Sequence, residues 1–130
     1  GRVQFTIDLR HPDKQVLHNL GDRIREVAEE NVGACSVAVS DNLLVDPTIF
    51  DPEIKDAIRD NAQRLGLKSM DMPSGAGHDA MHLAKVCPVG MIFVPCLRGV
   101  SHNEAESATP EDLAAGAKVL AETLYRLANS

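Results

Sequence analysis

The chain is poor in aromatic residues, contains no tryptophan and has no long apolar run. Only 3% of its 130 residues are aromatic, so its core must be aliphatic. No stretch approaches the roughly 20 apolar residues of a membrane span, and no charged-then-apolar leader opens the sequence. From this sequence we expect no membrane partner and no signal peptide.

The chain also lacks the excess of basic residues that nucleic-acid binding requires. Its formal net charge is −6, from 19 acidic and 13 basic residues, whereas phosphate binding needs a positive surface. The three cysteines, Cys35, Cys87 and Cys96, are odd in number and lack a C-x-x-C spacing. We therefore expect no nucleic-acid partner, and free thiols in the reducing environment of the cytoplasm.

The first third of the sequence predicts a β-α-β unit. Residues Val3–Arg10 alternate between apolar and polar side chains, which is typical of a half-buried strand. A helix from Lys14 to about Asn31 follows, capped by Asp13 and closed by Gly33. Cys35–Val39 predicts a second strand. These elements would make up half of a small α/β sandwich domain.

The remaining sequence predicts helices packed on a parallel sheet, and so an α/β fold class overall. Leu43–Phe50 has the composition of an extended connector, which divides the chain at about residues 44 and 45. The elements expected after it are helices over Pro52–Leu65, His78–Lys85 and Pro110–Leu127, and strands over Leu67–Met72 and Val89–Pro95.

A polar turn after the last predicted strand carries the first candidate site. It presents His102 beside Glu104 and Glu106, and α/β enzymes place their chemistry at strand ends. His102 is either a metal ligand or an exposed loop histidine. One histidine is not a complete catalytic metal site, which needs about three protein ligands. Cys96 is either a nucleophile with His102 as its base or a small buried thiol.

The segment Ser74–His82, SGAGHDAMH, offers three interpretations. On a helix, His78 and His82 would share a face with Asp79 between them, an imperfect imitation of the H-E-x-x-H zinc motif. Alternatively, the backbone N–H groups around Gly77 could bind a carboxylate at a helix start. The third interpretation is a tight turn without a ligand.

Asp8 and Arg10 lie on the polar face of the first predicted strand. They form either a surface ion pair or a site in which the planar guanidinium captures a substrate carboxylate. Their spacing alone favours the ion pair.

Four segments together resemble one enzyme family. These are FTIDLRHPD (residues 5–13), PSGAGHDA (73–80), GMIFVP (90–95) and GVSHNEAE (99–106). Their order and spacing resemble the N-carbamoyl-L-amino-acid hydrolase and allantoate amidohydrolase family, within the zinc-dependent aminoacylase and carboxypeptidase superfamily. The resemblance covers essentially the whole chain.

The resemblance implies a role for each part of the chain. Residues 1–44 match the second half of a lid domain that mediates homodimerisation, and residues 45–130 match the last part of a catalytic domain with a two-metal site. His102 matches a metal ligand for zinc or manganese. Arg10 and the Gly77 backbone match groups that hold the carboxylate of a carbamoyl or ureido amino acid, and His78 lies beside them.

Other features of that family have no counterpart in this sequence. In that family an H-x-D motif, a bridging aspartate, a Glu-Glu pair and a further histidine lie well before the lid, and no part of these 130 residues matches that region. We therefore expect a C-terminal fragment of a longer metal-dependent enzyme, inactive by itself and unable to retain the metal. Two alternatives are a self-associating module without catalysis, and an autonomous metal-binding protein that uses His78 and His82.

Overall fold

The computed structural model describes residues 1–30 and 32–129. The chain divides into two compact units. Unit 1 comprises Gly1–Thr48 and Pro73–Gly77, and unit 2 comprises Ile49–Met72 and the chain from His78 on. The expected division at residues 44 and 45 into parts of two larger domains stays a prediction.

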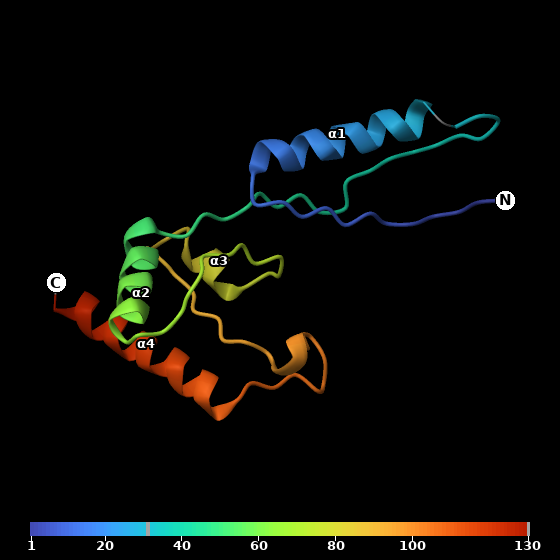
Figure 1. Cartoon of the computed structure of the whole chain (residues 1–130). Coiled ribbons are helices and arrows are strands. Elements are labelled where there is room, and N and C mark those ends of the chain that lie inside the picture. Colours follow the sequence, from blue (N-terminus) through green and yellow to red (C-terminus); the bar gives the residue numbers. More distant parts are fainter. Residues whose placement is uncertain (31, 130) are drawn as a thin grey trace. The chain divides into compact units, whose positions relative to one another are not determined.

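Helices account for all the regular structure of the described residues (Figure 1). The α-helices are α1 (Lys14–Glu30), α2 (Pro52–Arg64), α3 (Asp79–Leu83) and α4 (Pro110–Ala128), and one 3-10 turn, η1, spans Leu97–Gly99. The predicted positions of α1, α2 and α4 are confirmed to within a residue or two at each described end. The expected end of the first helix at Asn31 lies outside the described residues. The third helix is shorter than predicted.

The helix boundaries follow from local capping chemistry. At the start of α1, the Asp13 carboxylate accepts a hydrogen bond from the Val16 N–H at 2.9 Å. Before α2, the Asp51 carboxylate accepts hydrogen bonds from the N–H groups of Glu53 and Ile54. Thr109 caps α4 by accepting the Asp112 N–H at 3.1 Å. Such caps supply partners for N–H groups that the first helical turn leaves unpaired.

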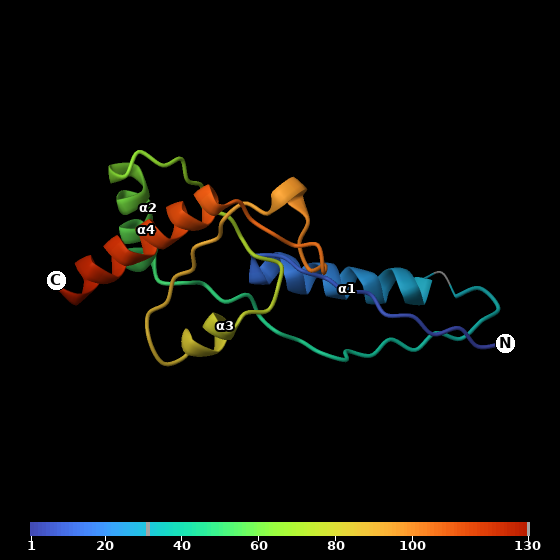
Figure 2. The ribbon, with the colours of Figure 1, turned by 90° about the horizontal axis from the view of Figure 1, so that it is seen from below.

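The predicted strands are wrong for the described residues, none of which forms a hydrogen-bonded strand. In unit 1, the segment before α1 and the segment after it run in the same direction, opposite to α1 (Figure 1 and Figure 2). The expected β-α-β unit is therefore not supported, because the two segments share no ladder of hydrogen bonds. Alternating side chains predict an extended backbone, but a strand also needs a neighbour that supplies partners for its N–H and C=O groups.

Unit 2 is organised around the packing of α2 against α4 (Figure 1). Its buried side chains include Ala57 and Val119, together with two polar groups, Asn61 and Thr123. The Asn61 amide donates to the Thr123 hydroxyl at 3.2 Å, and that hydroxyl donates to the Val119 carbonyl at 2.7 Å. At the surface, Arg126 donates to Asp60 at 3.2 Å. The two helices are thus joined by a buried polar contact as well as by apolar packing.

Two glycines let the backbone of residues 89–94 lie close to these helices. A Cβ at Gly90 would lie 2.5 Å from Ile54 Cγ2 on α2. A Cβ at Gly116 of α4 would lie 2.5 Å from Val94 Cγ1. The Asp51 N–H also donates to the Val89 carbonyl at 3.0 Å. The segment predicted as a strand over Val89–Pro95 is therefore anchored to α2 and α4, although it has no strand partner among the described residues.

Many large apolar side chains are exposed in both units. Phe5 is 79% exposed, and Val3 and Ile7 of its alternating face are also exposed, whereas Leu9 is half-buried. On α4, Leu113, Leu120 and Leu124 form an exposed apolar stripe beside the buried face. Among the described residues, no helix combines the length and apolarity that crossing a bilayer requires.

We predict that Thr123→Val destabilises the chain by about 1–3 kcal/mol, because it leaves the buried Asn61 amide without its acceptor. Urea unfolding followed by circular dichroism at 222 nm measures the change. Thr123→Ser is the matched control: it keeps the hydroxyl and loses one buried methyl group, at a cost of about 1 kcal/mol. Equal stability of Thr123→Val and the wild type would contradict the role given to this contact.

Candidate functional site

The loop Cys96–Ser107, called here the histidine loop, is a closed turn in unit 2. The Leu97 N–H donates to the Ser107 carbonyl at 2.7 Å and ties the two ends of the loop together. Within it, η1 leads to Gly99 at φ +70°, and Arg98 also has a positive φ of +57°. The Glu106 N–H donates to the Asn103 carbonyl at 2.9 Å. These bonds give the loop a defined backbone without a sheet.

His102 occupies a left-handed backbone conformation at φ +54°. Its N–H donates to the Glu106 carboxylate at 2.7 Å. Its Nδ1 lies 3.0 Å from the Ser101 hydroxyl. Among the described residues, Nε2 has no hydrogen-bond partner. A histidine held through Nδ1 presents Nε2 as its donor atom, which is how many metal-ligating histidines are oriented.

Glu106 also contacts Cys96 and so has two roles in the histidine loop. The Cys96 thiol donates to the second Glu106 oxygen at 3.7 Å. Partial burial raises the pKa of the Cys96 thiol, and the negative charge of Glu106 raises it further. A raised pKa leaves less thiolate, which is the nucleophilic form. The geometry therefore favours the structural interpretation of Cys96 over the nucleophilic one.

His78 precedes α3 instead of lying within it. Its backbone is extended, at φ −134° and ψ 148°, and it is the N-cap residue. Its ring lies against Phe93, with centroids 5.5 Å apart and planes tilted by 59°. Because only His82 lies in the helix, the two histidines do not share a helical face. The geometry that would imitate H-E-x-x-H is absent.

Arg10 makes the densest polar contacts of unit 1. Its Nε donates to the Asp8 carboxylate at 3.0 and 3.2 Å, and its Nη2 donates at 2.6 Å. Its Nη1 donates to the Gly75 carbonyl. The Arg10 guanidinium is thus oriented by two groups while its side chain stays 60% exposed. In the neighbouring turn, the Ala76 N–H donates to the Ser74 hydroxyl at 3.2 Å, two residues before His78.

The described residues do not provide a complete metal site. They contain no group of three or more His, Cys, Asp and Glu side chains able to hold a metal ion. A catalytic zinc needs about three protein ligands. Neither the cluster of His78, Asp79 and His82 nor the surroundings of His102 meets that requirement. The chain by itself therefore does not fit the two-metal centre that the resemblance implies.

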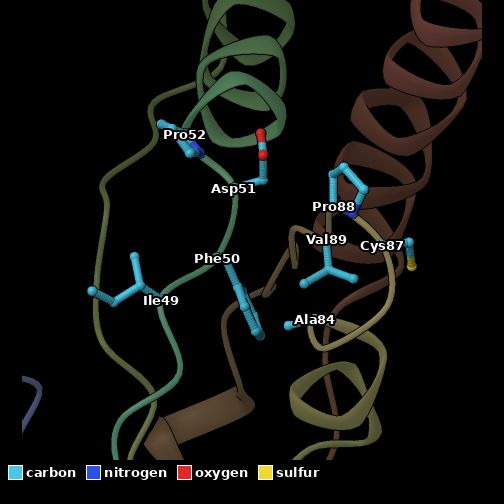
Figure 3. A pocket seen from close by; sticks show the side chains of 8 residues that line it. All are labelled: Ile49, Phe50, Asp51, Pro52, Ala84, Cys87, Pro88 and Val89. Carbon is cyan, nitrogen blue, oxygen red and sulfur yellow. The ribbon is translucent and has the colours of Figure 1, made fainter.

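A surface hollow of about 310 Å³ lies elsewhere in unit 2 (Figure 3). Phe50, Ala84 and Val89 turn toward one another there, and the Cys87 sulphur points away from them. The complete lining is Ile49, Phe50, Asp51, Pro52, Ala84, Cys87, Pro88 and Val89. None of the residues singled out from the sequence lines this hollow, and its one acidic group, Asp51, caps α2.

The sequence motifs located His102 and Arg10 but not the side chains that orient them. Ser101 and Glu106 were visible only as polar neighbours in GVSHNEAE. The spacing of four residues between His102 and Glu106 was a usable signal, because a closed turn brings such residues together. The contact between Arg10 and Gly75 joins residues 65 positions apart, and no local pattern predicts it.

Comparison with known proteins identifies the class of hydrolase to which this arrangement belongs. The family described as Peptidase family M20/M25/M40 matches residues 5–126. The chain is a member of this family. Its fold matches that of a Burkholderia cenocepacia protein described as an amidohydrolase or peptidase, with a TM-score of 0.82 and 44% identity over 92% of this chain and 30% of the other.

Two of the similar proteins are named amidohydrolases. The N-carbamoyl-L-amino-acid amidohydrolase of Rhizobium meliloti is 44% identical over 124 residues, covering 92% of this chain and 29% of the relative. The allantoate amidohydrolase of Escherichia coli K12 is 36% identical over 130 residues, covering 98% of this chain and 32% of the relative. The chain thus spans about 30% of the length of these relatives.

We predict that Glu106→Gln accelerates alkylation of Cys96 by iodoacetamide at pH 8. Removing the negative charge lowers the pKa of the thiol toward its ordinary value, and more thiolate is then present. Mass spectrometry of tryptic peptides gives the rate, with Cys35 and Cys87 as internal references. Glu104→Gln, in the same loop, is the matched control and should leave the rate unchanged. A Glu106→Gln rate equal to that of the wild type would exclude the Glu106 contact as a cause.

Proposed function

We propose that this chain supplies the carboxylate-binding arginine and one metal-binding histidine of an amidohydrolase. Its substrate is an N-carbamoyl-L-amino acid or a related ureido acid such as allantoate, and the bond broken is a non-peptide C–N bond. Family membership and the names of the relatives support this reaction class. The remaining metal donors and the general base come from residues other than these 130.

The observation that carries the proposal is the orientation of Arg10. The guanidinium is held by Asp8 and Gly75, yet it remains accessible to a solute. A planar, permanently charged group in a fixed orientation suits bidentate capture of a carboxylate. Gly77, two residues after Gly75, would contribute its backbone to the same carboxylate, and His78 would lie beside the substrate.

His102, in turn, coordinates a divalent metal ion, zinc or manganese, through Nε2. Its Nδ1 is engaged by Ser101 and its backbone by Glu106, so the imidazole has a defined orientation before any metal binds. When bound, such an ion supplies Lewis-acid chemistry at the substrate carbonyl. This chain's own contribution is to present one donor atom in a loop tied at both ends.

The domain assignment is also proposed. Residues 1–44 belong to a lid domain and residues 45–130 to the last part of a catalytic domain, in a cytoplasmic homodimer. The exposed apolar face of Val3, Phe5 and Ile7 supports association through the first part, since unpaired extended segments readily pair with another chain. The exposure of this apolar face also favours the second candidate function, which is a self-associating module without catalytic activity.

We predict that the purified 130-residue chain hydrolyses no N-carbamoyl-L-amino acid and binds zinc only weakly, because it provides a single donor at His102. Ammonia release and isothermal titration with zinc measure the two properties. His78→Ala and His82→Ala should leave the weak binding unchanged. Tight binding that disappears in those two variants would instead support an autonomous metal-binding protein.

The proposed function itself is tested in a chimera. This chain replaces the matching segment of the Rhizobium meliloti N-carbamoyl-L-amino-acid amidohydrolase, and hydrolysis of N-carbamoyl-L-methionine is assayed. We predict an active chimera in which His102→Ala lowers kcat by about 100-fold or more. Even the loss of a residue that only hydrogen-bonds to a metal ligand typically lowers metal affinity or activity 10- to 100-fold. Arg10→Lys should raise KM by about tenfold, because lysine lacks the planar fork.

His82→Ala is the matched control for the chimera and should leave both constants unchanged. Circular dichroism and gel filtration establish that each variant is folded. A folded chimera whose activity is indifferent to both His102→Ala and Arg10→Lys would refute the proposed roles.

A further inference from the structure

We propose that Asp8 and the Gly75 carbonyl are positioning groups for Arg10, and that together they leave one edge of its guanidinium open for the substrate carboxylate. This inference rests on the proposed function, because it concerns how the carboxylate-binding arginine of that function is oriented. Asp8 is assigned no contact with the substrate. Its effect is exerted entirely through Arg10.

Asp8 occupies one edge of the guanidinium. The Arg10 Nε and Nη2 atoms both donate to its carboxylate, at 3.0 and 2.6 Å. This side-on pairing uses two of the five N–H groups that an arginine carries. Residues two apart in an extended chain point to the same side, so the backbone itself places the Asp8 carboxylate next to Arg10.

The Gly75 carbonyl uses a third N–H and approaches from the opposite side. It accepts a hydrogen bond from Nη1. A Cβ built on Gly75 would lie 3.9 Å from Arg10 Cδ, so Gly75 sits beside the stem of the arginine. From this position we infer that its carbonyl takes the Nη1 hydrogen that points back toward Cδ.

The two remaining N–H groups, one on Nη1 and one on Nη2, therefore lie along the outer edge of the guanidinium. An edge with two parallel N–H groups is what a carboxylate requires for bidentate binding. The Arg10 side chain is 60% exposed, so solvent and small anions can reach it. The structure thus holds Arg10 on two sides and leaves a third for a ligand.

The negative charge of Asp8 opposes an incoming carboxylate, and this effect must be weighed against the loss of orientation. Both Asp8 and Arg10 are exposed, with side chains 63% and 60% accessible, and water screens such a repulsion strongly. Without Asp8, by contrast, the arginine loses two donor contacts and regains its rotational freedom, which a ligand must then restrict. Orientation therefore dominates, and removing Asp8 weakens binding.

The first test observes Arg10 itself in the 130-residue chain. The Nε–Hε signal of Arg10 is assigned by its loss in Arg10→Lys and followed in ¹⁵N-¹H spectra. A hydrogen-bonded Nε–H exchanges slowly with water, so we expect a sharp signal in the wild type and a broadened or missing one in Asp8→Asn. Asp8→Glu should restore it in part. Asp41→Asn, which removes the exposed Arg25–Asp41 pair of the same unit, is the matched control and should leave the signal unchanged.

The second test titrates the same variants with N-carbamoyl-L-alanine. We expect Asp8→Asn to weaken binding at least fivefold, Arg10→Lys at least as much, and Asp41→Asn not at all. Asp8→Asn binding as tightly as the wild type, while Arg10→Lys does not, overturns the positioning role and leaves the proposed function intact. Equal binding by the wild type and Arg10→Lys instead overturns the role of Arg10 in the proposed function, and the inference about Asp8 falls with it.

Discussion

The buried contact between Asn61 and Thr123 is the interaction on which unit 2 depends. It joins α2 to α4 in a core that is otherwise built from small residues such as Ala57 and Ala62. The extended backbone of residues 89–94 lies against both helices, through Gly90 on one side and Gly116 on the other. The histidine loop follows directly from that segment. The orientation of His102 therefore rests on the packing of α2 against α4, through Asn61, 41 residues before it in the chain, and Thr123, 21 residues after it.

Local and non-local structure differed in how far the sequence could predict them. The helices were predictable because their signals are local: Asp13, Asp51 and Thr109 cap the residues that follow them. The strands were not, although Val3–Arg10 alternates as a strand should. Alternation reports which side chains lie on one face, whereas a strand is defined by bonds to another segment. The described residues contain no such partner, so the backbone remains extended and unpaired.

The candidate site shows the same division. The motifs predicted that His102 and Arg10 would matter, but the groups that hold them became visible only in the structure. Glu106 was predicted as a neighbouring carboxylate, and it accepts the His102 N–H and the Cys96 thiol. His78 was predicted within a helix but precedes it, because α3 begins only at Asp79. A shift of one residue at a helix start was enough to remove the pairing of His78 with His82, which was one of three interpretations of this segment.

At His102, the backbone conformation lowers stability, while the side chain provides the donor atom proposed for the metal. A left-handed conformation costs a residue with a Cβ about 1 kcal/mol relative to glycine, and His102 adopts it at φ +54°. An evolutionary experiment that rewarded heat resistance alone would favour glycine or asparagine at this position. Such a replacement would raise the melting temperature while it erased the imidazole, so thermal screening of such libraries needs a separate assay that detects the lost donor atom.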